Sequence, residues 1–280
     1  MRQGSRIGRL MAGMAMAAFM GMSAKAEATT INYAAYTNAG VATHQTATAT
    51  FTFDPLGFLY IVLGETTPAA ASSLIGAPAI LTSIAFLLPT NTVMRGGIVT
   101  TCTTALCGAD VTPSGSVGFS ITTLGAGSDA SGEFGVTVGK RPIGCAGVGC
   151  VAGVADWDFV SVNEAQVIPM ASANLDGPAN LNGPQGGLLD DSGARGGLGV
   201  IDHAVKIRLT IDANKNTIDP DVLTGSQQVA FLSSVFTHSM VEYGSDAAFG
   251  RPVVPVVPEP ASMLLLGSGL VAMGVVRRKK

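Results

Sequence analysis

The sequence predicts an all-β protein whose main body is an antiparallel β-sandwich or jelly roll. Apolar and polar residues alternate with a period of two, and Gly, Pro, Asn and Asp interrupt the chain at short intervals. No long stretch of the body has the spacing of an amphipathic helix. Many short strands separated by turn residues are typical of sandwiches and jelly rolls. Two small β domains are the alternative to a single sandwich.

The clearest strand runs from His203 to Asp212, because its aliphatic residues fall on one face and its charged residues on the other. Thr alternates with Ala or Phe in Thr46–Phe53, which predicts a second strand. The other expected strands are Phe58–Leu63, Ile80–Leu88, Ile98–Thr101, Val117–Thr123, Phe134–Val138, Ala155–Val162 and Val229–Val241.

The composition excludes several functional classes. Charged residues make up 12% of the 280 residues, about half of the ~25% usual in soluble domains. The chain has neither the basic stripe of a nucleic-acid binder nor the charged heptads of a coiled coil. All 19 acidic residues lie between Glu27 and Glu259, and half of the 16 basic residues lie outside that stretch. Basic ends around an acidic body indicate membrane targeting at both termini.

Residues 1–26 have the three regions of a secretory signal peptide. A basic start precedes thirteen apolar residues, Leu10–Met22, and small residues follow at Ala24 and Ala26. Thirteen helical residues span about 20 Å, which is too short for a ~30 Å bilayer core. We expect signal peptidase to cut after Ala26, so that the exported body is 27–251.

The C-terminal segment has three consecutive parts. Residues 252–260 carry prolines every third position, which favours an extended polyproline II spacer. Residues 261–276 are uncharged and predict a short transmembrane helix. A basic cytoplasmic end follows at 277–280, formed by Arg277, Arg278, Lys279 and Lys280, which stops transfer across the membrane.

Val257, Pro258, Glu259 and Pro260, followed by a short apolar segment and a basic end, resemble the PEP-CTERM sorting signal. That signal occurs on exported proteins of Gram-negative bacteria that make extracellular polysaccharide. The resemblance implies that a membrane-embedded exosortase recognises Pro-Glu-Pro and removes the tail. It implies a transient stay in the inner membrane and then release to the cell surface or extracellular polysaccharide matrix. It covers about Val257–Lys280 only.

The four cysteines form two Cys-x4-Cys units, Cys102 with Cys107 and Cys145 with Cys150. The spacing alone also fits a four-thiolate zinc site. Export favours disulfides over a zinc site, because exported proteins reach oxidising compartments in which disulfides form and persist. Three pairings exist for four cysteines. We expect the local pairs, because those partners are always close.

Two carboxylates, Asp156 and Asp158, flank Trp157 in an expected strand and so share one face, about 7 Å apart. Paired acids at this spacing are used in glycoside hydrolysis. The simpler interpretation is a solvated strand face with Trp157 and Phe159 pointing inward. The three histidines, His44, His203 and His238, are scattered, and no GxSxG motif is present.

A run of oxygen-bearing side chains follows the clearest strand and resembles the start of a calcium loop: Asp212, Asn214, Asn216, Asp219 and Asp221. Thr217 replaces the required glycine and Leu223 the closing glutamate, so a plain turn is the simpler interpretation. Since export favours disulfides over a zinc site, calcium is the one cofactor that we keep as a candidate.

Residues Ala173–Gly199 contain a tandem repeat of Asn-Leu-Asx-Gly-Pro and read as a long exposed loop. The sequence therefore favours a non-enzymatic surface or matrix protein, structural or associated with polysaccharide, with no nucleic-acid partner. The alternative is a secreted carbohydrate-active hydrolase or a calcium-dependent lectin on a β-sandwich.

Overall fold

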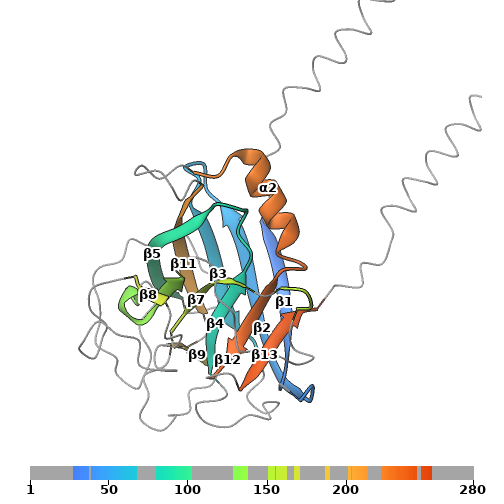
Figure 1. The fold of residues 1–280 in the computed structure, drawn as a ribbon. Helices are drawn as coiled ribbons and strands as arrows, with labels where there is room; N and C mark the ends of the chain where they lie inside the picture. Colours follow the sequence, from blue (N-terminus) through green and yellow to red (C-terminus); the bar gives the residue numbers. More distant parts are fainter. Residues whose placement is uncertain are drawn as a thin grey trace, which may run out of the picture.

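The computed structural model describes residues 28–37, 39–67, 80–102, 129–137, 151–154, 156–162, 167–170, 187–189, 201–202, 204–213, 222–244 and 247–253. These residues form thirteen strands, a short 3₁₀ helix and an α-helix (Figure 1). The strands of the first half are β1 (Thr29–Tyr36), β2 (Ala42–Phe53), β3 (Leu59–Glu65), β4 (Leu81–Phe86) and β5 (Val93–Cys102). The 3₁₀ helix η2 (Ser131–Glu133) is followed by β6 (Gly135–Thr137), β7 (Asp158–Ser161), β8 (Val167–Pro169), β9 (Leu188–Leu189) and β10 (Ile201–Asp202). The last elements are β11 (Ala204–Asp212), the helix α2 (Gly225–Ser234), β12 (Ser239–Tyr243) and β13 (Ala248–Pro252).

All of these strands belong to one sheet. Its main order is β5-β11-β3-β2-β1-β13-β12-β4-β7-β6-β8, and β9 joins at β4 and carries β10. Every neighbouring pair along the main order is antiparallel. The prediction of an all-β, antiparallel body is confirmed.

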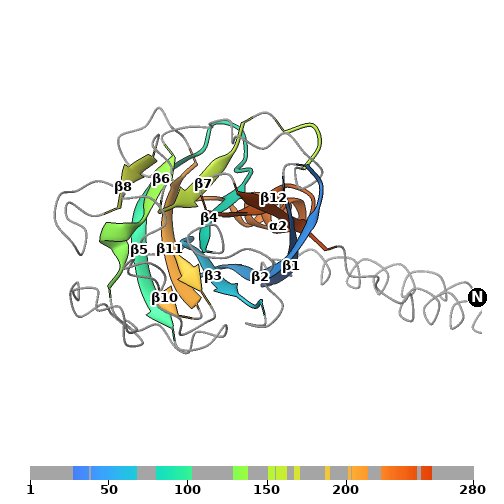
Figure 2. The same ribbon diagram turned by 90° about the horizontal axis from the view of Figure 1, so that it is seen from below.

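The sheet curls until its two ends meet, so the body is a near-closed barrel (Figure 2). The Ala130 amide donates to the Val99 carbonyl on β5 at 2.9 Å, and the Val99 amide donates to the Ser131 hydroxyl at 2.9 Å. Thr100 and Asp129 form a further bridge at this seam. Two separate sheets were expected instead. A long twisted sheet that closes on itself buries one face and protects its edges without needing a second sheet.

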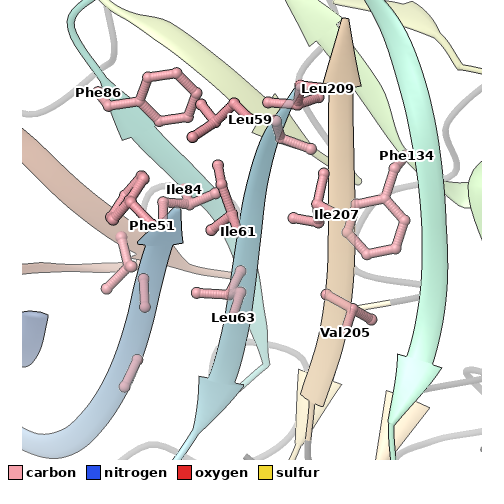
Figure 3. Packing of buried hydrophobic residues seen from close by; sticks show 14 of the residues in the cluster. Phe51, Leu59, Ile61, Leu63, Ile84, Phe86, Phe134, Val205, Ile207 and Leu209 are labelled. Atoms are coloured by element: carbon pink, nitrogen blue, oxygen red, sulfur yellow. The ribbon is translucent and has the colours of Figure 1, made fainter. Parts of the chain in front are cut away.

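The inner face of the barrel is the main hydrophobic core (Figure 3). On β2 and β3 the side chains alternate, so that one residue in two points inward, as the period of two predicts. Side chains from different strands face one another there, and they include Phe51, Ile61, Ile84, Phe134 and Ile207. The described interior is therefore packed mainly with aliphatic and aromatic groups.

The prediction of a strand over Val229–Val241 was wrong in its first half, where α2 forms. Thr224 and Gln227 make a capping box, with the Thr224 amide donating to Oε1 of Gln227 at 2.9 Å. Phe231 of α2 packs edge-to-face against Phe51, Phe53 and Phe86. Burial of this aromatic group at one end of the barrel selects the helix, while β12 occupies only the end of the predicted range.

Seven other predicted strands overlap strands of the structure, namely β2, β3, β4, β5, β6, β7 and β11. The predicted strand Val117–Thr123 lies outside the described residues. The prediction missed β1, β8, β9, β10 and β13. β9 lies within Ala173–Gly199, where a long exposed loop was expected, and its Leu188 is buried. β1 and β13 pair with each other, and each has a second partner, β2 for β1 and β12 for β13.

Candidate functional site

The strand β13 carries the chain from the barrel into the C-terminal segment. It is paired on both sides, with Pro252 opposite Tyr33 of β1 and Gly250 opposite Val241 of β12. The Val253 amide donates to the Asn32 carbonyl at 2.7 Å, one residue beyond the strand. Pro258 follows five residues later, and five extended residues reach at most about 17 Å. Five residues therefore separate the last described hydrogen bond of the sheet from the Pro-Glu-Pro motif.

Tight packing fixes β13 in the sheet. A Cβ atom on Gly250 would lie 2.5 Å from Cγ2 of Val241 and 3.3 Å from Cβ of Tyr33. The Tyr33 hydroxyl lies 2.8 Å from Oγ of Ser239, which itself donates to the Val235 carbonyl at 2.6 Å. Burial raises the pKa of Tyr33 well above its usual value, and the hydrogen bond with Ser239 opposes part of that rise. Tyr33 thus ties β1 to the start of β12 and the end of α2.

The first strand begins and the last strand finishes at the same end of the barrel. β1 begins at Thr29, and its antiparallel pairing puts that start beyond the point where β13 finishes (Figure 1). The predicted signal-peptidase site at Ala26 precedes Thr29 by three residues. α2 lies at this end too, because Phe231 contacts Phe51, which is paired with Thr29, and Phe53, two residues further along β2.

The two acidic residues around Trp157 differ in their surroundings. Asp158 is buried, and its Oδ2 accepts a hydrogen bond from the Leu88 amide at 3.0 Å. Asp156 is exposed. Trp157 and Phe159 pack in a second, smaller cluster with Ala85, Met240 and Phe249. Asp158 thus binds the backbone just after β4. The prediction that its side chain lies on a solvated strand face was wrong.

Asp212 ends β11 in an ion pair. Its Oδ2 lies 2.6 Å from Nη2 and 3.0 Å from Nε of Arg95 on β5. The Asp212 side chain is 1% exposed and that of Arg95 is 46% exposed. The guanidinium already neutralises the first carboxylate of the predicted calcium loop. The other members, Asn214, Asn216, Asp219 and Asp221, lie outside the described residues, so calcium binding stays a prediction.

The described cysteine, Cys102, ends β5 opposite Ala204 of β11. It is disulfide-bonded, and no free cysteine occurs in the described part of the chain. Cys107, Cys145 and Cys150 lie outside that part, so the local pairing stays a prediction.

The histidines lie on separate elements where the structure describes them. His44 lies in β2 with a positive φ of 61°. His238 precedes β12, and its Nδ1 lies 2.9 Å from the Thr237 hydroxyl. His203 is outside the described residues. Among the residues that the structure describes, no three His, Cys, Asp or Glu side chains form a group that could hold a metal.

A buried polar group that the sequence analysis did not identify lies where β3 and β12 end. Glu65 and Tyr243 are both buried. Burial raises the pKa of Tyr243 well above its usual value, the negative charge of Glu65 raises it further, and the Thr67 side chain opposes the rise. Thr67 also accepts a hydrogen bond from the Thr46 amide at 2.8 Å. The period of two through Leu59, Ile61 and Leu63 continues to Glu65 and was the signal for its inward position.

The targeting residues themselves lie outside the described part of the chain. This applies to Ala24 and Ala26, to the motif Val257–Pro260, to the predicted transmembrane helix 261–276 and to the basic end 277–280. None of the helices in the described ranges is both long and apolar enough to cross a membrane.

Comparison with protein families identifies the C-terminal segment. The PEP-CTERM protein-sorting motif matches residues 256–280, which begin three residues after Val253. The resemblance seen in the sequence is therefore confirmed for this segment, and it supports an exported protein that an exosortase processes. No curated protein and no solved structure matches the chain.

Proposed function

We propose that this chain is an exported barrel that is held at the inner membrane by its C-terminal segment and then released by an exosortase. The observation that carries the proposal is the sorting motif at 256–280. It follows shortly after β13, which has a neighbouring strand on each side in the sheet. Signal peptidase cuts after Ala26, the apolar segment 261–276 stops transfer, and the four basic residues 277–280 stay inside. Release carries the barrel to the cell surface or the extracellular polysaccharide matrix.

The position of β13 makes cleavage compatible with an intact fold. Exosortase cuts near Pro258, Glu259 and Pro260, downstream of the last described hydrogen bond of the sheet at Val253. Proline disfavours helix, so we expect the motif to be extended and accessible to the enzyme. Cleavage then removes the tail and leaves every described strand in the released product.

The test compares the C-terminus of the surface fraction by mass spectrometry. We expect the wild-type product to end near the motif. The triple variant Pro258→Ala, Glu259→Ala and Pro260→Ala should remain full-length and membrane-bound. Pro255→Ala is the matched control, because it changes a spacer proline outside the motif and should be processed normally. A surface product that ends at Lys280 contradicts the proposal.

The released barrel has a non-enzymatic role, structural or associated with polysaccharide. The outer face of β2 supports this, because four partly exposed threonines, Thr46, Thr48, Thr50 and Thr52, form a row along it. The Thr30 and Thr50 hydroxyls lie 2.9 Å apart across β1 and β2. Lys206 covers the ring of Tyr60 at 4.8 Å on the neighbouring strands. Rows of hydroxyls beside cationic groups suit hydroxyl-rich or acidic glycans.

A co-sedimentation assay with the extracellular polysaccharide of the producing cells tests this role. We expect Thr48→Glu combined with Thr52→Glu to reduce the bound fraction, because two negative charges disrupt the hydroxyl row. Thr90→Glu is the control, since Thr90 is exposed in the connection between β4 and β5. Equal binding by both variants and the wild type contradicts a role for this face.

The alternative of a carbohydrate-active hydrolase gains no support from the acid pair. Asp158 is buried and accepts the Leu88 amide, whereas Asp156 is exposed. A general acid and its partner must both reach the same glycosidic bond. The non-enzymatic role is therefore the one that we propose.

A further inference from the structure

Exposed large apolar side chains gather at the end of the barrel from which the tail leaves. The described residues expose six of them, and five lie at this end: Leu56 (70%), Val222 (51%), Val253 (48%), Val229 (38%) and Phe236 (38%). We call these five the apolar stripe. The sixth, Val41 at 63%, lies at the opposite end, in the connection between β1 and β2. Single exposed apolar residues are ordinary, but a group at one end needs an explanation.

The stripe is held in place by the fold. Asp54 accepts hydrogen bonds from the amides of Leu56 and Phe58, both at 2.9 Å, which fixes the turn between β2 and β3. Gly57 has a φ of +86°, and a Cβ atom there would lie 2.7 Å from Cβ of Val222. Val222 therefore packs beside the turn residue Gly57, next to Leu56 in the chain, and both Leu56 and Val222 are exposed.

α2 continues the stripe from Val222 toward Val253. Phe231, Leu232 and Val235 are buried against the barrel, while Val229 and Phe236 point outward. The whole stretch from Val222 to Thr237 contains no Asp, Glu, Lys or Arg. Surface helices of soluble domains normally carry charges on the outer face. This outer face carries Ser, Gln, Thr and apolar groups instead.

Chain length keeps the stripe close to a membrane. Val253 belongs to the stripe, and the apolar segment of the sorting motif begins eight residues later, at Ala261. Eight residues of polyproline II span about 25 Å. A surface tethered at this distance meets the bilayer at a high effective concentration, so that weak contacts suffice.

We infer that the apolar stripe seats the barrel on the outer lipid surface of the inner membrane while the tail is attached. The occupant of the stripe is lipid, and this step rests on the proposed function. The body is rich in acidic residues, which anionic lipids repel, whereas the Val222–Thr237 stretch has no charge to be repelled. Interfacial apolar groups enter the headgroup boundary by about 5–10 Å. Removal of the tail abolishes the tether, so that the barrel leaves the membrane after cleavage.

Depth-dependent fluorescence quenching tests the inference with the full chain. The chain is reconstituted in phosphatidylethanolamine–phosphatidylglycerol vesicles with ordinary or brominated acyl chains. The variants are Leu56→Trp and Val229→Trp in the stripe, with Val41→Trp as the matched control at the opposite end. The native Trp157 is buried, at 3% exposure, and the wild-type chain gives its background signal. We expect brominated lipid to reduce the added emission of both stripe variants roughly two-fold and to leave that of Val41→Trp unchanged.

Each other result overturns the inference. Quenching at none of the three positions means that the stripe does not face lipid, and equal quenching at all three means that the barrel has no preferred face toward the membrane. Cross-linking between copies through the stripe, without quenching, makes a second copy the occupant. Flotation of the vesicles separates failure of the inference from failure of the proposed function. A chain that floats without stripe quenching is anchored but not seated, whereas a chain that does not float lacks the anchor itself.

Discussion

The backbone amide of Val253 donates to the carbonyl of Asn32 at 2.7 Å, so the last described residue lies beside the first strand of the barrel. The hydrogen bond joins residues 221 positions apart in the sequence. It ties the residues that precede the sorting motif to the first strand of the sheet. The start of β1 and the end of β13 therefore lie at the same end of the barrel.

Gly250 should be essential to the packing of β13. We expect Gly250→Ala to lower the free energy of unfolding by about 1–3 kcal/mol, because the new Cβ overlaps Val241 and approaches Tyr33. Urea denaturation of the full chain in detergent measures the change. Gly225→Ala is the control, since no atom lies within 4 Å of its added Cβ. Equal midpoints for the two variants would contradict the close approach.

Phe231 should anchor α2 to the barrel. Its ring lies 5.7–6.0 Å from those of Phe51, Phe53 and Phe86. We expect Phe231→Ala to destabilise the fold by about 3–5 kcal/mol, through lost burial and the cavity that remains. Val229→Ala on the exposed face of the same helix should change stability by less than about 0.5 kcal/mol. If chemical denaturation gives similar losses for both, α2 is not docked through this ring.

Stability should fall at alkaline pH because Tyr33 and Tyr243 are buried in the neutral form. Their folded-state pKa values are raised above the usual 10.0. The stabilisation is thus fully present below pH 10 and is lost as the pH rises above it, because only the unfolded chain ionises there. Urea midpoints measured from about pH 8 to 11 follow the loss. Tyr33→Phe combined with Tyr243→Phe should flatten this decline, and an equally steep decline in the variant would assign it to other groups.

The cysteines should be paired within each Cys-x4-Cys unit, Cys102 with Cys107 and Cys145 with Cys150. Closing so short a loop stabilises by about 2 kcal/mol in the chain-entropy model, against about 4 kcal/mol for a loop of forty residues. Reduction should therefore lower the melting temperature modestly. A non-reducing peptide map identifies the pairs, and a fragment linking Cys102 to Cys145 or Cys150 would show the opposite connectivity.

The alternation of apolar and polar residues in the sequence was enough to predict most strands of the body. In β11 and β2 every second residue is buried, and that alternation is visible in the sequence alone. The candidate chemical sites were less predictable. Asp158 and Asp212 looked like ligands or acids, but the structure engages them with the Leu88 amide and with Arg95. Those partners lie 70 and 117 residues away, so no local pattern indicates them.

The sequence by itself determined that the protein is β-rich and carries a PEP-CTERM sorting segment. Both properties depend on local features, namely the period of two and the order of motif, apolar run and basic end. Only the tertiary structure decided that the sheet closes on itself, that α2 replaces a strand, and that β1 begins at the end of the barrel where β13 finishes. Each of these depends on contacts between distant residues, such as Val99 with Ala130, Phe51 with Phe231 and Asn32 with Val253. Such contacts form because burial of apolar surface and satisfaction of backbone hydrogen bonds are optimised over the whole chain rather than within a segment.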